Sequence, residues 1–139
     1  MPRAISILLI LLATSALPVF AVTNVGIRFT VPEEPAGIND LHVDFKSVGS
    51  VTDVEHIPNP PAPASDVSWP VVSYGGDTVD FSGVAVTAGQ TTSYRFVFSL
   101  TGLIFGDDWK TQYVQSATWT RNGKGVADAK PNMTLVAYE

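Results

Sequence analysis

The chain has 139 residues, a formal net charge of -5 at pH 7 and no cysteine. Because cysteine is absent, the sequence excludes disulfides, thiolate metal sites and thiol nucleophiles. The length corresponds to one ordinary domain, and the moderate acidity argues against nucleic acid or an anionic membrane surface as a partner.

Residues 1–21 have the composition of a secretory signal peptide. A basic start at Arg3 is followed by an apolar run over 5–12, and small residues precede a plausible cleavage site after Ala21. Cleavage would leave residues 22–139 as a soluble protein that is secreted, periplasmic or held at the cell surface. The alternative is an uncleaved anchor, which the short apolar run disfavours because a spanning helix needs about 20 apolar residues.

The remainder of the chain alternates apolar and polar residues with a period of two, which is typical of strands with one buried face. No window shows a helical stripe. Turn signals separate the runs, among them Asn122-Gly123, which suits a tight turn with positive φ. About eight short strands of this kind predict an all-β, antiparallel β-sandwich. We expect them at 25–31, 41–45, 51–57, 67–74, 78–83, 94–100, 113–121 and 133–138.

The segment 56–70 carries five of the ten prolines of the chain. We predict that its central part, 57–66, is a loop inside a single domain that spans 22–139. Residues 22–57 supply only about three strands, and such a piece is too small to bury a core by itself. The alternative is a flexible linker, since a long loop without regular structure is uncommon in a compact domain.

The stretch "VDFSGVAVTAGQTTSYRFVFSLTG" over 79–102 resembles bacterial extracellular immunoglobulin-like or fibronectin-type-III-like modules. In these modules a strand, a turn of the form xxGQT/S and an aromatic-aliphatic strand follow one another, and "NDLHVDF" and "ATWTRNGK" also resemble their strands. The resemblance implies an immunoglobulin-like sandwich with a role in adhesion, spacing, filament building or ligand display. It carries over no functional residue, and the missing cysteines exclude an antibody-type domain.

Four aromatic residues are candidates for ligand binding, because they lie in loops or at strand ends: Trp69, Tyr74, Trp109 and Tyr113. Exposed rings on a sandwich can stack on the sugars of a polysaccharide. The alternative is that they close the ends of the core and keep a polar edge near water.

Histidines and carboxylates supply the candidate metal ligands. His42 and Asp44 share the outward face of one predicted strand, and a transition metal could bind there if the fold also brought His56 close. Asp107 and Asp108 are adjacent oxygen donors of the kind that calcium prefers. The alternatives are an isolated surface histidine and ordinary turn chemistry. No other cofactor is expected.

No nucleophile elbow and no serine or acid partner for a histidine is evident by spacing, so we expect no enzyme. The leading hypothesis is an exported structural or interaction module, such as a subunit of a cell-surface assembly. It would bind a protein partner or a second copy through an edge strand at 23–31. A carbohydrate-binding module and a periplasmic metal-binding protein are the alternatives. Asn132 also begins a match to the N-glycosylation acceptor pattern.

Overall fold

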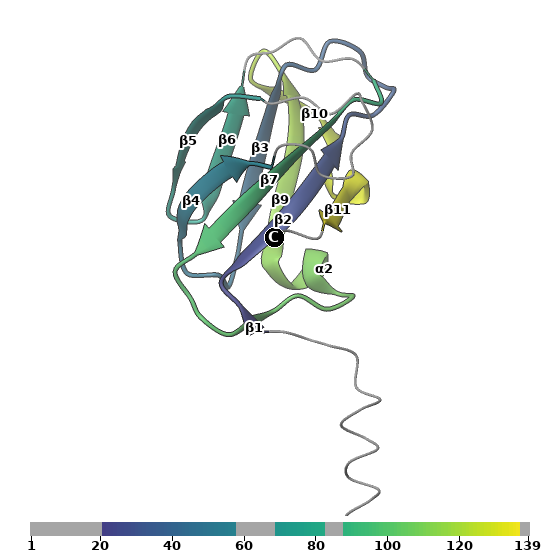
Figure 1. Ribbon diagram of the computed structural model, residues 1–139. Coiled ribbons are helices and arrows are strands. Elements are labelled where there is room, and N and C mark those ends of the chain that lie inside the picture. The colour runs from purple at the N-terminus through teal and green to yellow at the C-terminus, as the bar shows by residue number, and fades with distance from the viewer. Residues whose placement is uncertain (1–20, 58–68, 83–87, 137–139) are drawn as a thin grey trace, which may run out of the picture.

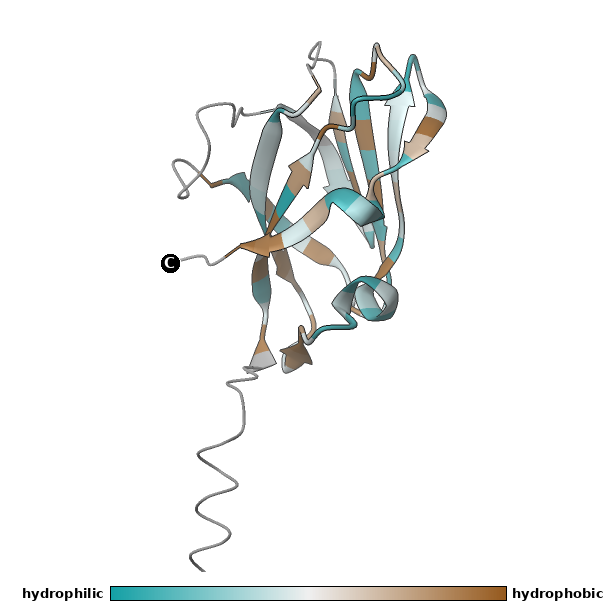
Figure 2. Cartoon of the chain, turned by 90° about the vertical axis from the view of Figure 1, so that its right-hand side faces the viewer, coloured by the Kyte–Doolittle hydropathy of each residue, from teal (hydrophilic) through white to brown (hydrophobic). Residues whose placement is uncertain are grey.

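The alternating segments form two antiparallel sheets that face each other as a β-sandwich (Figure 1). The computed structural model describes residues 21–57, 69–82 and 88–136. Figure 2 shows apolar and polar bands following one another along the strands, so the two faces of each sheet differ in hydropathy. This is the arrangement that a period of two produces when one side of a sheet is buried.

The four-stranded sheet has β2 (Asn24–Thr30) and β7 (Thr91–Phe98) at its centre. On the outer side of β2 lies β11 (Met133–Val136), and on the outer side of β7 lies β4 (Val51–His56). The segment 23–31, which was predicted as an edge strand, contains β2, and the predicted edge position is wrong because β2 lies between β11 and β7. The late strand β11 returns to β2 and pairs with it from Met133↔Phe29 to Val136↔Gly26.

The five-stranded sheet has β3 (Asp40–Phe45) at its centre, between β6 (Thr78–Ser82) and β9 (Val114–Arg121). Its outer strands are β5 (Val71–Gly75), beside β6, and β10 (Lys124–Asp128), beside β9. The predicted Asn122-Gly123 turn joins β9 to β10 and is confirmed, with φ values of 52° and 82°. Each sheet therefore contains strands from both sides of the proline-rich segment, of which 58–68 lies outside the described residues.

Three small elements lie outside the two main sheets. The strands β1 (Ala21–Val22) and β8 (Leu103–Ile104) form a two-stranded ribbon. A five-residue helix, α2 (Trp109–Tyr113), leads into β9, and a 3-10 turn, η1 (Lys130–Asn132), leads into β11. The predicted cleavage site after Ala21 thus falls within β1, whereas residues 1–20 of the predicted leader lie outside the described residues.

The largest side chains buried in the core between the sheets are aromatic. Phe45 and Phe96 meet edge to face with ring centroids 5.2 Å apart, and Phe81 lies 4.4 Å from Tyr94. A second cluster closes one end, where Phe105 stacks on Tyr113 at 4.5 Å. Such pairs add to the free energy of unfolding beyond the area that they bury, so a chain without disulfides can hold this fold by packing.

Each predicted strand corresponds to a strand of the sandwich, while β10, the β1–β8 ribbon and α2 were not predicted. The consecutive strands β2 and β3 lie in opposite sheets. The immunoglobulin-like arrangement remains a prediction.

Candidate functional site

The outer face of the five-stranded sheet carries rows of short polar side chains. Alternation turns the apolar residues of β3 and β6 inward, so His42 and Asp80 point outward and lie directly opposite each other. Thr118 on β9 faces His42 from the other side. Two parallel rows flank this one, made of Ser82, Asp40 and Thr120 on one side and of Thr78, Asp44 and Ser116 on the other.

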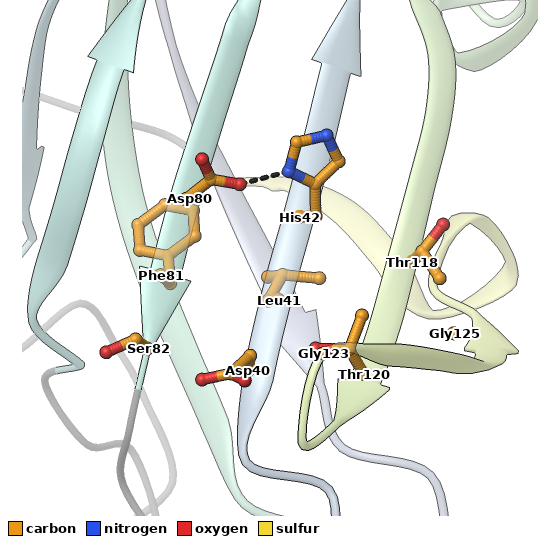
Figure 3. A pocket seen from close by; sticks show the side chains of 10 residues that line it. All are labelled: Asp40, Leu41, His42, Asp80, Phe81, Ser82, Thr118, Thr120, Gly123 and Gly125. Atoms are coloured by element: carbon orange, nitrogen blue, oxygen red, sulfur yellow. Dashed lines mark hydrogen bonds and ion pairs between the residues drawn. The ribbon is translucent and has the colours of Figure 1, made fainter.

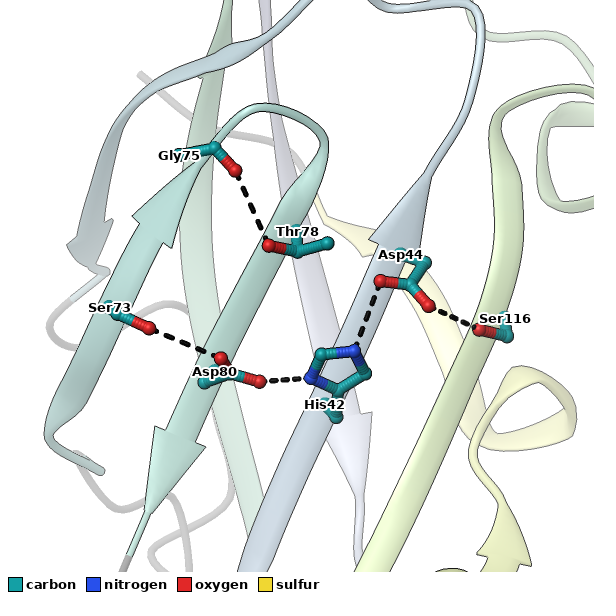
Figure 4. Close-up of polar contacts among 7 residues, drawn as sticks. All are labelled: His42, Asp44, Ser73, Gly75, Thr78, Asp80 and Ser116. Carbon is teal, nitrogen blue, oxygen red and sulfur yellow. Dashed lines mark hydrogen bonds and ion pairs between the residues drawn. The ribbon is translucent and has the colours of Figure 1, made fainter.

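A hydrogen-bonded network links four strands across this face (Figure 4). The imidazole of His42 lies between two carboxylates: its Nε2 is 3.0 Å from Asp44 Oδ1, and its Nδ1 contacts Asp80 Oδ1. Ser116 Oγ donates to Asp44 Oδ2 at 2.9 Å, and Ser73 Oγ donates to Asp80 Oδ2 at 3.1 Å. Each carboxylate is thus held on both sides, by the imidazole and by a serine hydroxyl.

The network favours the charged form of His42. Partial burial of the ring lowers its pKa, but the hydrogen bond and charge of Asp80 and then those of Asp44 raise it. Together the two carboxylates outweigh the burial, so the pKa of His42 lies above its ordinary value of 6.5.

Beside this network the sheet surface sinks into a shallow hollow of about 510 Å³ (Figure 3). The hollow lies over β6, β3, β9 and the start of β10. At Gly125 an added Cβ would come within 3.0 Å of Thr118 Cγ2, so glycine keeps that side open. The polar side chains along the hollow are Asp40, His42, Asp80, Ser82, Thr118 and Thr120.

The outer face of the four-stranded sheet is different, because the side chains of Ile57 and Arg95 cover part of it. An added Cβ at Gly26 would lie 2.9 Å from Ile57 Cδ1, so Ile57 packs directly on the sheet there. Arg95 extends over the same sheet to Glu55 at 3.0 Å and to Asp53 at 3.3 Å. The five-stranded sheet therefore offers the more open face of the two.

The aromatic candidates do not gather on the surface. Trp69 is 3% exposed, Trp109 6% and Tyr113 5%, whereas Tyr74 is 44% exposed. Trp69 packs edge to face on Trp119, and Trp109 and Tyr113 belong to the cluster around Phe105. Sugar stacking would need at least two exposed rings side by side, and these four supply one.

The metal candidates are likewise dispersed. His42 and Asp44 do meet, as predicted, but His56 lies on the other sheet with its ring 5.5 Å from that of Tyr94. Asp107 and Asp108 are exposed in the loop before α2. No set of three or more ligating side chains suited to a metal ion occurs among the described residues. At His42 the carboxylates approach opposite ring nitrogens, so the three groups do not converge on one point.

Sequence reasoning missed Asp80 and the hollow. The alternation in "TVDFSG" does indicate that Asp80 points outward, but no local pattern says that β6 pairs with β3. Asn132, the start of the match to the glycosylation pattern, is partly exposed in η1.

No protein-family model matches the chain, and no curated protein or solved structure matches it either. Within the described ranges, no helix has the length and apolar character needed to cross a bilayer.

Proposed function

We propose that the chain is an exported, non-enzymatic β-sandwich that works as an interaction module. It binds a protein partner through the outer face of its five-stranded sheet. The observation that carries this proposal is the hollow beside His42, which is lined by short polar side chains and left open by Gly125. The leader-like composition of residues 1–21 supports export.

The hydrogen bonds of the polar network favour binding over catalysis. In a serine–histidine pair the hydroxyl donates to a histidine nitrogen that has a free lone pair. Ser73 and Ser116 instead donate to carboxylates, and both nitrogens of His42 face carboxylates as well. This arrangement supports a network that holds the surface in shape.

Charge indicates the chemistry of the partner. The charged groups along the hollow are Asp40, Asp80 and His42, so the carboxylates outnumber the imidazole. A partner that presents lysine or arginine side chains matches this lining, and complementary charge raises both specificity and the rate of association.

A differential capture experiment tests the proposed face. Full-length wild type and Thr120→Arg are exposed to extracts of the native host, with Thr111→Arg as the matched control. Thr120 lines the hollow, whereas Thr111 is exposed on α2. We expect wild type and Thr111→Arg to capture the same protein and Thr120→Arg to lose it. Equal capture by all three would contradict the proposal.

Self-association through β11 is a second candidate, supported by a comparison of the sheet edges. The pairings of β10, β4 and β5 each contain a register shift, and bulges of this kind protect edges from further pairing. The pairing of β11 has none, and its residues "MTLV" carry no charge. Among the described edges of the two main sheets, β11 is therefore the one least protected against a second copy.

Sedimentation velocity tests the second candidate. We expect wild type to form a dimer as its concentration rises and Thr134→Lys to remain monomeric, because an edge lysine opposes strand pairing. Thr111→Lys adds the same charge away from the edge and should dimerise like wild type. A wild type that stays monomeric at high concentration would exclude this route.

A further inference from the structure

The position of His42 between two carboxylates makes the network depend on one proton. A neutral imidazole has one donor and one acceptor nitrogen, whereas the imidazolium has two donors. Asp80 and Asp44 approach different ring nitrogens. Only the charged ring can donate to both, so loss of the proton leaves a lone pair directed at one carboxylate and breaks that contact.

The neighbouring elements provide little else that could replace this charge. From its own strand His42 is flanked by Asp40 and Asp44, and β6 contributes Asp80. Strand β9 faces it with the uncharged Thr118. One strand further out, β5 presents Ser73, and β10 carries Lys124 at one end and Asp128 at the other.

We propose that protonation of His42 controls the shape and charge of the hollow, and through them the affinity for a basic partner. This inference rests on the proposed function, because it concerns regulation of the same face. When His42 is charged, its imidazolium donates hydrogen bonds to the carboxylates of both Asp80 and Asp44. With His42 neutral, one carboxylate is released beside the hollow and the face becomes one unit of charge more negative. A lysine or arginine of the partner then takes the place of the imidazolium.

Nuclear magnetic resonance of the free, full-length protein tests the switch without a partner. The imidazole nitrogens of His42 and the backbone amides of Thr118 and Gly125 are followed from about pH 5 to pH 9, a range that brackets the ordinary histidine pKa. We expect His42 to titrate above 6.5 and the two amides, which border the hollow, to shift with the same midpoint.

Three variants identify the origin of the midpoint. Asp80→Asn and Asp44→Asn should each lower it, because each removes a charge that favours the imidazolium. Asp53→Asn is the matched control, since Asp53 pairs with Arg95 on the other sheet. A His42 midpoint at or below 6.5, or hollow amides that do not follow it, would overturn the inference.

A binding measurement with the captured partner distinguishes this inference from the proposed function. The protein captured by wild type and Thr111→Arg is titrated at about pH 5.5 and pH 8.5. For one exposed ion pair we expect binding to be about two- to fivefold weaker at the lower pH, and independent of pH in His42→Gln. Equal affinity at both pH values in wild type overturns the regulation and leaves the binding face intact. Capture that Thr120→Arg does not reduce overturns the binding face itself.

Discussion

The hydroxyl of Tyr94 closes a two-way hydrogen bond with the backbone of Trp69. It accepts from the Trp69 N–H at 2.6 Å and donates to the Trp69 carbonyl at 2.7 Å, and both residues are buried. The chain that enters β5 is thus fixed to β7 in the opposite sheet. This contact holds Trp69 inside the sandwich, where its indole ring cannot stack on a ligand.

Removing this hydroxyl should destabilise the fold. In Tyr94→Phe a buried N–H and a buried carbonyl lose their partner, so we expect the free energy of unfolding to fall by about 1–3 kcal/mol. Urea denaturation followed by tryptophan fluorescence measures the change. Tyr74→Phe is the control, because Tyr74 is exposed and its variant should stay within about 0.5 kcal/mol of wild type. Equal losses in the two variants would contradict the role of the contact.

The tryptophans should be shielded from a soluble quencher. Trp69, Trp109 and Trp119 are all buried, so we expect blue-shifted emission and weak quenching by acrylamide in the native protein. Both properties should change sharply in concentrated urea, which serves as the exposed reference. A native tryptophan that is quenched as strongly as in the unfolded chain would contradict this burial and would support the hypothesis that exposed rings stack on sugars.

Stability should decrease as the pH rises through the titration of His42. Its pKa is raised in the folded state, so its contribution is fully present below the unfolded value and is lost as the pH passes the folded pKa. His42 is 41% exposed at its side chain, and solvent screening limits the effect to a few tenths of a kcal/mol. Urea denaturation between about pH 5.5 and pH 8.5 measures it. His42→Gln should lack this component of the pH dependence. If the free energy of unfolding changed with pH in the same way in both proteins, His42 would not be the origin of the effect.

A methyl group should be tolerated at one sheet glycine and not at another. In Gly26→Ala the new Cβ would lie 2.9 Å from Ile57 Cδ1 and 3.0 Å from the Val136 carbonyl oxygen. Such overpacking costs about 1–3 kcal/mol. Gly75 in β5 has open space around the same position, so Gly75→Ala should keep or slightly raise the free energy of unfolding. Chemical denaturation of both variants checks the difference, and a Gly26→Ala variant as stable as Gly75→Ala would refute the close approach.

Periodicity revealed the strands but not their partners. Strict alternation in "LHVDF" predicted both the strand and the outward direction of His42 and Asp44. It gave no information on pairing between β3 and β6, and therefore none on the contact to Asp80. Strand β10 escaped prediction because "KGVAD" is short and rich in residues that are rare in strands.

The aromatic residues show a second limit of sequence reasoning. Trp109 and Tyr113 were expected in loops or at strand ends, and they instead lie one helical turn apart on the five-residue helix α2, both facing the core. A helix of this length is too short to produce a periodic stripe. Whether an aromatic residue at a strand end faces inward depends on tertiary packing, which a single sequence does not reveal.

The pairing of β11 with β2 has a consequence for biosynthesis. Strand β2 leaves the ribosome long before its neighbour β11 exists, and domains fold as units only when their strands are available. Until β11 has been synthesised, one edge of β2 has no strand to pair with. The four-stranded sheet therefore stays incomplete, and the nascent chain remains unfolded or bound by chaperones. Delayed closure of this kind agrees with the proposed export, in which the chain would cross a membrane before it folds.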